Sequence, residues 1–150
     1  MNGNRAATLG QAPHRYDLRV YYEDTDAGGI VYHANYLRFA ERARTEALRA
    51  MGVPHADLVR EHHRMFVVRR VKLDYLRPAR LDESLSVLTD QRGLGAASVR
   101  LRQDVVGAEG VCAAATIELA CVRADTGRPA RIPPAWREAL KGLQAAPPPG

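Results

Sequence analysis

Apolar and polar residues alternate over positions 16–23, which predicts a half-buried β-strand at the start of the folded region. The apolar face of this strand carries Tyr16, Leu18, Val20 and Tyr22. Over residues 35–51 the apolar positions recur at spacings of three and four, which predicts an amphipathic helix. Gly52 and Pro54 follow directly, and residues of these two types commonly end helices.

The rest of the chain has mainly the pattern of β-strands. Residues 54–62 fit a short helix, and a strand then begins at Arg64 and ends before the segment 77–80, whose proline cannot donate to a ladder. One face of this strand is apolar apart from Arg69, and its members are Met65, Val67, Val71, Leu73 and Tyr75. Further elements are predicted as strands at 83–91, 97–106 and 110–123, and as a C-terminal helix opened by Pro133-Pro134 that carries Trp136 and Leu140.

This order of elements predicts an α+β fold in which one long helix packs into a curved, five-stranded antiparallel sheet. We expect one domain over residues 15–143, preceded by a flexible lead at 1–14 and followed by a Pro-rich tail at 144–150. The two edge strands of such a sheet keep unpaired backbone groups, so pairing with a second subunit is expected.

The composition fits a globular protein, with 46% hydrophobic and 26% charged residues among 150. No apolar run approaches the roughly eighteen residues that suggest a membrane span, and no secretory signal pattern is present. Cys112 and Cys121 would lie too far apart on one strand to form a disulfide, which favours a reduced, cytoplasmic protein.

The net charge of +5 indicates anionic partners such as a phosphorylated cofactor, an acidic protein, nucleic acid or a membrane surface. Nucleic acid is the weaker interpretation, because few aromatic residues are left over from the predicted core to stack on bases. At most a peripheral membrane contact is expected.

Metal and serine-nucleophile sites are not predicted. Asp24 and Asp26 are spaced like the opening of a calcium loop, but the glutamate that such a loop needs at its twelfth position is missing. His62 and His63 are adjacent and lack a matching set of carboxylates or cysteines. No serine stands in a GxSxG motif.

The acidic turn before the long helix is the remaining candidate for chemistry. Asp26 and the pair Gly28-Gly29 stand just ahead of the predicted helix start. A carboxylate can activate water or attack a carbonyl, and free N–H groups at a helix start can hold developing negative charge. On these grounds alone a structural interpretation of Asp26, as a residue that forms an Asx-turn or a helix cap, is favoured, because aspartates are frequent in turns.

Two long motifs carry a family resemblance. They are YYEDTDAGGIVYHANYLRFAERARTE, within residues 20–50, and FVVRRVKLDYLRPARLDE, at residues 66–83. Both closely resemble the acyl-CoA thioesterases associated with the bacterial Tol–Pal system, in the 4-hydroxybenzoyl-CoA thioesterase branch of the hot-dog superfamily. The resemblance extends over about residues 15–133 and implies the hot-dog fold, in which a curved antiparallel sheet wraps a long helix.

The resemblance implies specific roles. The second aspartate of the DTD triplet, Asp26, would act as nucleophile or general base on the thioester carbonyl, and the backbone N–H of His33 would bind the oxyanion. Gly28, Gly29, Ile30 and Tyr32 are the accompanying candidates for substrate contact. An acyl-CoA substrate, no metal, no separate cofactor and a site between the subunits of a homodimer or homotetramer are also implied.

Several alternatives stay open. The chain could be a binding module for acyl groups or acyl carrier protein without activity, or a thioesterase for aromatic acyl-CoA. A hot-dog dehydratase is the nearest other enzyme, but no facing histidine and carboxylate pair is identifiable. Arg92, Arg100 and Arg102 are candidates for contacts to the phosphates of coenzyme A, because a guanidinium matches phosphate geometry.

Overall fold

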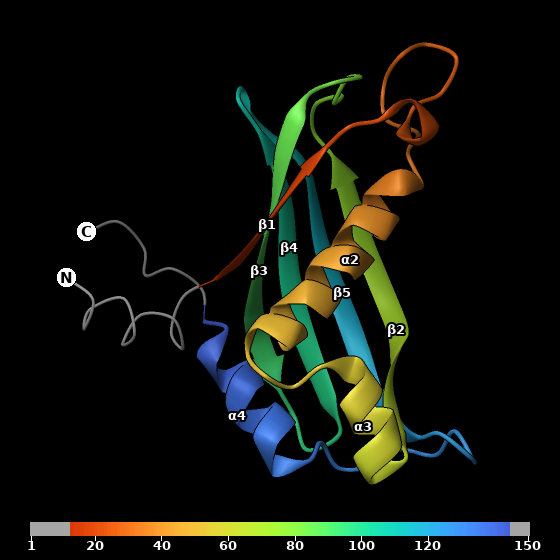
Figure 1. Ribbon diagram of the computed structural model, residues 1–150, viewed down its shortest axis with the longest axis vertical. Coiled ribbons are helices and arrows are strands. Elements are labelled where there is room, and N and C mark those ends of the chain that lie inside the picture. The colour runs from red at the N-terminus through yellow and green to blue at the C-terminus, as the bar shows by residue number, and fades with distance from the viewer. Residues whose placement is uncertain (1–12, 145–150) are drawn as a thin grey trace, which may run out of the picture.

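The computed structural model describes residues 13–144 of the chain (Figure 1). The elements in chain order are β1 (His14–Arg19), the 3₁₀ helix η1 (Tyr22–Asp24), α2 (Asn35–Ala50), α3 (His55–His62), β2 (Arg64–Tyr75), β3 (Ser84–Leu94), β4 (Ser98–Gly107), β5 (Gly110–Arg123) and α4 (Pro134–Gly142). The predicted lead and tail lie almost wholly outside the described residues. Of their members, His14 begins β1 and Gln144 forms a bridge to Gln91.

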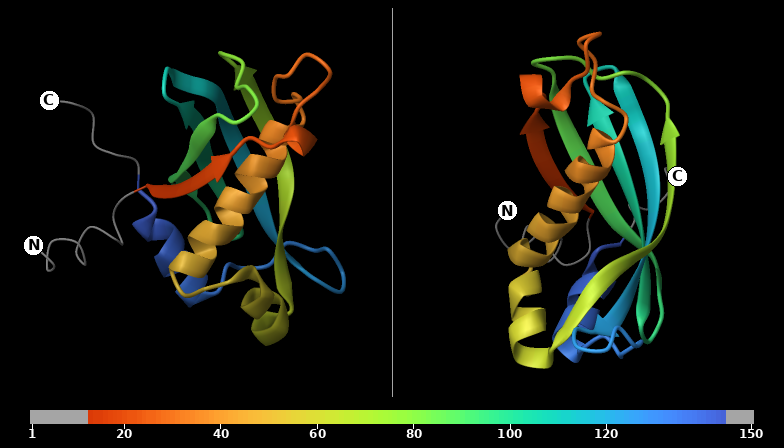
Figure 2. Two further views of the ribbon diagram at one scale, coloured as in Figure 1. Left: turned by 45° about the horizontal axis from the view of Figure 1, so that its top comes forward. Right: turned by 90° about the vertical axis from the view of Figure 1, so that its right-hand side faces the viewer.

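The strands form one antiparallel sheet in the order β1-β3-β4-β5-β2. The long helix α2 lies against one face of this curved sheet, while α3 and α4 lie at one end of it (Figures 1 and 2). The predicted α+β hot-dog architecture is therefore confirmed. Because β1 and β2 each have one strand neighbour, they are the two edges of the sheet.

The apolar stripe of α2 is buried against the sheet. Ala40, Ala43 and Ala47 are at most 2% exposed, and their small side chains allow the helix to approach the strands closely. Phe39 belongs to the cluster of buried side chains near the helix start, which also contains Val87. A second buried cluster joins the other end of α2 to Trp136 and Leu140 of α4 and is completed by side chains of β4 and β5.

The first predicted strand is too long. It ends at Arg19, and residues 22–24 form η1 instead, which leaves Tyr22 82% exposed. Val20 is fully buried, as the alternation predicted, and its N–H donates to the carbonyl of Glu83. The alternation of residue types therefore continues past the point where the chain leaves the sheet.

A β-bulge in β2 changes the predicted faces of that strand. The register against β5 shifts between Val68 and Arg70, which leaves Arg69 as the extra residue. Before the bulge, Phe66 and Val68 border a pocket beside α2, whereas after it Tyr75 packs against Tyr36 of that helix. The prediction that Met65 and Val67 share a face with Val71, Leu73 and Tyr75 is therefore wrong, because the extra residue inverts the alternation.

The other predicted elements are confirmed to within a few residues. Helix α2 ends at Ala50, and Gly52 follows with φ of +79°, a conformation that glycine adopts without strain. Cys112 and Cys121 are both free and buried in β5. Within residues 13–144, no helix is long and apolar enough to cross a membrane.

Candidate functional site

The two aspartates of the DTD triplet have different surroundings. Asp24 is only 5% exposed, and its carboxylate accepts hydrogen bonds from the N–H of Tyr21 at 2.9 Å and from Nδ2 of Asn35 at 2.8 Å. Its backbone carbonyl also accepts the N–H of Tyr32 at 2.9 Å. Asp24 therefore joins η1, the following turn and the first residue of α2, which is a structural role.

Asp26 is exposed at the tip of the same turn. Its Oδ1 accepts the N–H of Gly28 at 2.9 Å, and its backbone carbonyl accepts the N–H of Gly29 at 3.0 Å. The turn is closed by a third bond of 2.9 Å, from the N–H of Asp26 to the carbonyl of Ile30. The predicted Asx-turn is thus present, but it uses one oxygen of the carboxylate, and Asp26 forms no other side-chain hydrogen bond within residues 13–144.

The geometry of the turn explains why both Gly28 and Gly29 are glycines. Gly29 has φ of +78°, a left-handed conformation that strains any residue with a Cβ. Gly28 lies so close to Asp26 that an added Cβ would stand 3.3 Å from Oδ1. The glycine pair therefore sets the shape of the loop and leaves room for the Asp26 carboxylate.

The start of α2 provides free backbone donors. Asn35 donates its N–H to the carbonyl of Tyr32 at 2.8 Å, whereas the N–H groups of His33, Ala34 and Tyr36 have no acceptor among the described residues. An unpaired N–H such as that of Tyr36 is usual in the first turn of a helix, whereas His33 and Ala34 belong to the turn that leads into α2. The helix dipole adds partial positive charge at this end of α2. The predicted donor, the N–H of His33, is therefore free to bind an oxyanion.

A pocket of about 310 Å³ opens beside these donors. It is bordered by Ile30, Val31, His33, Tyr36, Tyr75, Leu76, Arg77 and Pro78. Its size is near the lower end of the range of about 300–1,000 Å³ for small-molecule pockets, and most of its walls are apolar. Of the predicted residues, Ile30 and His33 line this pocket, while Asp26, Gly28, Gly29 and Tyr32 belong to the adjoining turn.

Tyr75 connects the end of β2 to the helix start. Its hydroxyl donates to the carbonyl of His33 at 2.9 Å, and its ring packs edge-on against the rings of His33 and Tyr36. The hydroxyl of Tyr36 in turn accepts the N–H of Ala79 at 3.2 Å, and the carbonyl of Ala79 accepts the N–H of Val31 at 2.8 Å. Burial raises the pKa of Tyr36 above its ordinary value, so its hydroxyl stays protonated.

The role of Tyr75 was missed by sequence reasoning, which treated it only as an apolar residue on a strand. The contact between Tyr75 and His33 spans 42 positions, so no local pattern predicts it. The one available signal was an aromatic residue with a hydroxyl at the end of a strand, just before Arg77 and Pro78. Asn35 was missed as well, although it is a buried polar residue at a helix start, where a partner is required.

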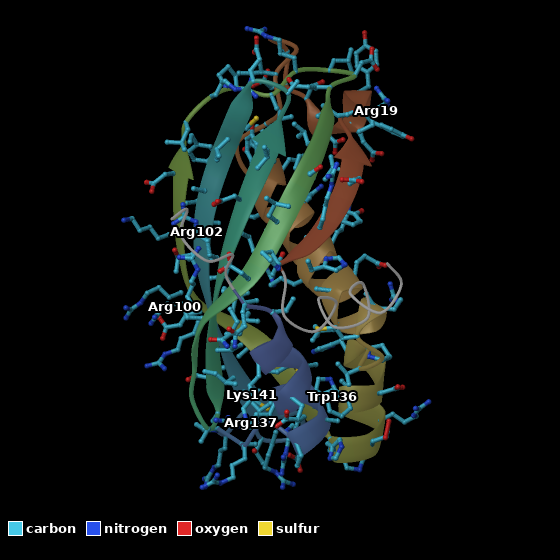
Figure 3. The ribbon with its side chains drawn as sticks, turned by 90° about the vertical axis from the view of Figure 1, so that its left-hand side faces the viewer. Arg19, Arg100, Arg102, Trp136, Arg137 and Lys141 are labelled. Carbon is cyan, nitrogen blue, oxygen red and sulfur yellow. The ribbon has the colours of Figure 1, made fainter. Side chains whose placement is uncertain are left out.

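The arginines considered for coenzyme A phosphates lie away from this pocket. Arg100 and Arg102 extend from the face of the sheet opposite α2 (Figure 3). Arg102 pairs with Asp104 at 2.7 Å, and Arg100 donates to the carbonyl of Arg92 at 2.9 Å. The arginine that does border the pocket is Arg77.

A larger depression of about 670 Å³ lies elsewhere, along β1 and the neighbouring ends of β3 and β4. Its charged groups are already engaged, since Arg15 and Asp17 pair at 2.8 Å and Arg19 donates to the carbonyl of Asp82 at 2.7 Å. It contains no free helix terminus. We therefore place the candidate site at the smaller pocket, which adjoins the segment that carries Asp26 and the unpaired N–H donors.

No group of three histidine, cysteine, aspartate or glutamate side chains within residues 13–144 is arranged to hold a metal ion. The chemistry available at the turn is that of a carboxylate and backbone donors. Asp26 can act as a base or a nucleophile, and the N–H of His33 can stabilise an oxyanion.

Comparison with known proteins shows the family of the chain. The family model for the "Thioesterase-like superfamily" matches residues 20–140. Over 129 residues the chain is 39% identical to a Haemophilus influenzae protein named acyl-CoA thioesterase YbgC. The matched region covers 86% of this chain and 95% of that protein. Over 95 residues it is 47% identical to the Escherichia coli O157:H7 protein named acyl-CoA thioester hydrolase YbgC, covering 63% of this chain and 70% of that protein.

A solved structure is similar along nearly its whole length. It is a probable thioesterase from Bartonella henselae, with a TM-score of 0.77 and 35% sequence identity. The alignment covers 81% of this chain and 99% of that chain.

Proposed function

Because the chain belongs to the thioesterase-like superfamily and is a thioester hydrolase, we propose that it cleaves acyl-CoA to a free carboxylic acid and coenzyme A, with Asp26 as the reacting carboxylate. The observation that carries this proposal is the position of one exposed carboxylate, free on one oxygen, in the same short segment as the free N–H groups at the start of α2. The apolar pocket beside them offers space for an acyl group.

The proposed reaction begins with attack on the thioester carbonyl. Either Asp26 removes a proton from water, whose oxygen attacks the carbon, or Asp26 attacks directly and water then hydrolyses the resulting anhydride. In both routes the carbonyl oxygen becomes negative and accepts the N–H of His33. The carbon–sulfur bond then breaks, and the thiolate of coenzyme A leaves and takes up a proton. Preorganised donors of this kind contribute on the order of 10²–10³ in rate.

The subunit arrangement is part of the proposal. We infer a homodimer or homotetramer in which β2 takes part in the contact, because this edge strand carries exposed apolar side chains. They are Val68, Val71 and Tyr75, and Leu76 follows the strand directly. Tyr75 and Leu76 also border the candidate pocket, so a subunit seated there would complete its walls.

The proposal also includes the family branch, the cellular location and a protein partner. The Tol–Pal association and the 4-hydroxybenzoyl-CoA branch rest on motif resemblance alone. A cytoplasmic location is supported by the two free cysteines. An acyl carrier protein as a further partner is supported only by the net charge of +5.

The proposal is tested by the hydrolysis of short, long and aromatic acyl-CoA by the full-length protein and by its Asp26→Asn variant. We expect kcat/KM to fall by about 100-fold or more, because the variant keeps the size of the side chain and loses its basicity. Glu23→Gln is the matched control, since Glu23 is exposed in the same segment. Equal activity of the Asp26→Asn variant and wild type would refute the role of Asp26, and tight binding without turnover in wild type would favour a binding module.

A further inference from the structure

A second pocket, of about 270 Å³, is lined by residues of α2, α3, β2 and β5. Its apolar walls are Leu48, Phe66, Val68 and Leu119, and its polar residues are Glu41, Arg44, Thr45 and His55. Four of these residues, Arg44, Leu48, Phe66 and Leu119, also line a small cavity of about 20 Å³ that continues into the core. None of them borders the candidate catalytic pocket.

Arg44 is the distinctive group of this pocket. Its Nη1 donates to Oε1 of Gln103 at 3.0 Å, and Gln103 is fully buried. The amide of Gln103 is held by two further bonds of 2.9 Å each, from Nε2 to the carbonyl of Ala40 and to Oγ1 of Thr89. Because Gln103 is fixed by these bonds, its oxygen holds the guanidinium in one position at the pocket wall.

The guanidinium of Arg44 has no counter-ion among residues 13–144. It has five N–H donors, of which one is used, and it forms no ion pair within the described part of the chain. Burial lowers the pKa of Arg44, which expresses the cost of keeping a charge in apolar surroundings. Its charge and its remaining donors are thus available to a carboxylate, which an arginine can bind in a bidentate manner.

Neither of the other titratable groups of the pocket, Glu41 and His55, provides a cation for a carboxylate ligand. Glu41 is exposed, and although its charge raises the pKa of Arg44, it does not approach within ion-pair distance. His55 accepts the N–H of Phe66 at Nε2, at 3.3 Å, and burial lowers its pKa. His55 is therefore neutral near pH 7 and does not provide a second cation.

We infer that this pocket is a binding site for a medium-chain aliphatic carboxylate, with the carboxylate on Arg44 and the hydrocarbon chain against Leu48, Phe66 and Leu119. The volume favours a medium rather than a long chain, because it lies just below the usual range of about 300–1,000 Å³ for ligand pockets. Arg44 follows Asn35 by nine residues along α2, which is roughly 13 Å at 1.5 Å per residue. Within one subunit the site is thus separate from the turn of Asp26, and Val68 at its wall is also one of the side chains proposed for the subunit contact. Binding to Arg44 can be measured without the proposed hydrolysis.

The test is a calorimetric titration of octanoate into the full-length protein. We expect saturable binding that weakens by about tenfold or more in Arg44→Met, because the charge-assisted hydrogen bonds to the carboxylate are lost. Arg42→Gln is the matched control, since Arg42 is an exposed arginine of the same helix. Asp26→Asn should bind octanoate like wild type, which separates this site from the proposed catalytic one.

One further ligand and one further variant test the role of the charge and of its geometry. Octanol has a similar chain without a carboxylate and should bind much more weakly than octanoate. Arg44→Lys keeps the charge but not the bidentate geometry and should fall between wild type and Arg44→Met. Absence of octanoate binding to wild type, equal binding by a folded Arg44→Met variant, or equal affinity for octanol would each overturn the inference.

Discussion

Asn35, the first residue of α2, donates a hydrogen bond of 2.8 Å to the carboxylate of Asp24, and both side chains are almost fully buried. This bond holds the acidic turn against the start of the helix. Asp26 lies only two residues farther along, yet its carboxylate faces solvent. Asp24 therefore stabilises the turn, whereas Asp26 remains accessible for the proposed chemistry.

The first prediction concerns Asp24→Asn. Each carboxylate oxygen of Asp24 accepts one bond, so in either orientation of an asparagine an NH₂ group would face a donor. We expect the free energy of unfolding to fall by about 1–3 kcal/mol, the cost of leaving a buried polar group unpaired. Urea denaturation measures this loss, and Glu23→Gln and Asp26→Asn should each change stability by less than about 0.5 kcal/mol. A fully stable Asp24→Asn variant would contradict the structural role of Asp24.

The second prediction concerns Tyr75→Phe. The change removes the hydroxyl that donates to the carbonyl of His33 and keeps the ring that packs against Tyr36. We expect kcat/KM for acyl-CoA to fall by about threefold to tenfold, because one hydrogen bond of about 0.5–1.5 kcal/mol no longer orients the helix start. Steady-state kinetics measure the effect. Tyr22→Phe, which alters a tyrosine that is 82% exposed, should leave the kinetics unchanged.

The third prediction compares the two glycines of the turn. Gly29→Ala places a Cβ on a residue with φ of +78° and should lower the free energy of unfolding by about 1–2 kcal/mol. Gly28→Ala meets only Oδ1 of Asp26, at 3.3 Å, so its effect should fall on activity. A displaced carboxylate should lower kcat/KM by about tenfold with little change in stability. The reverse pattern, with Gly28→Ala unfolding and fully active, would exclude this account of the turn.

Much of the fold was predictable because its signals are local. The stripe of Tyr36, Phe39, Ala40, Ala43 and Ala47 follows the helical period, and tertiary contacts preserve it. The bulge at Arg69 was not predictable, since apolar residues continue at the same parity on both sides of it. Only the pairing with β5 shows where the extra residue falls.

The candidate site was predictable in part. The motif pointed to Asp26 and His33, and both lie around the start of α2. Asp24 and Asp26 are the same residue type in the same turn, and the difference between them arises from the buried amide of Asn35. Tyr75 lies on a strand more than forty positions after His33, and its hydroxyl donates to the carbonyl of that residue. The residue spacing within the turn does not predict this contact.

The last prediction concerns the exposed edge of the sheet. Val71 lies on β2 and is 39% exposed, and we expect Val71→Glu to prevent the proposed subunit pairing, because a carboxylate would be buried in an apolar contact. Sedimentation equilibrium should show a monomer, with a large loss of hydrolase activity because the pocket beside Tyr75 loses its second wall. Val59→Glu is the matched control, since Val59 of α3 is also 39% exposed. A Val71→Glu monomer with full activity would refute a shared site, and an unchanged oligomer would refute pairing through β2.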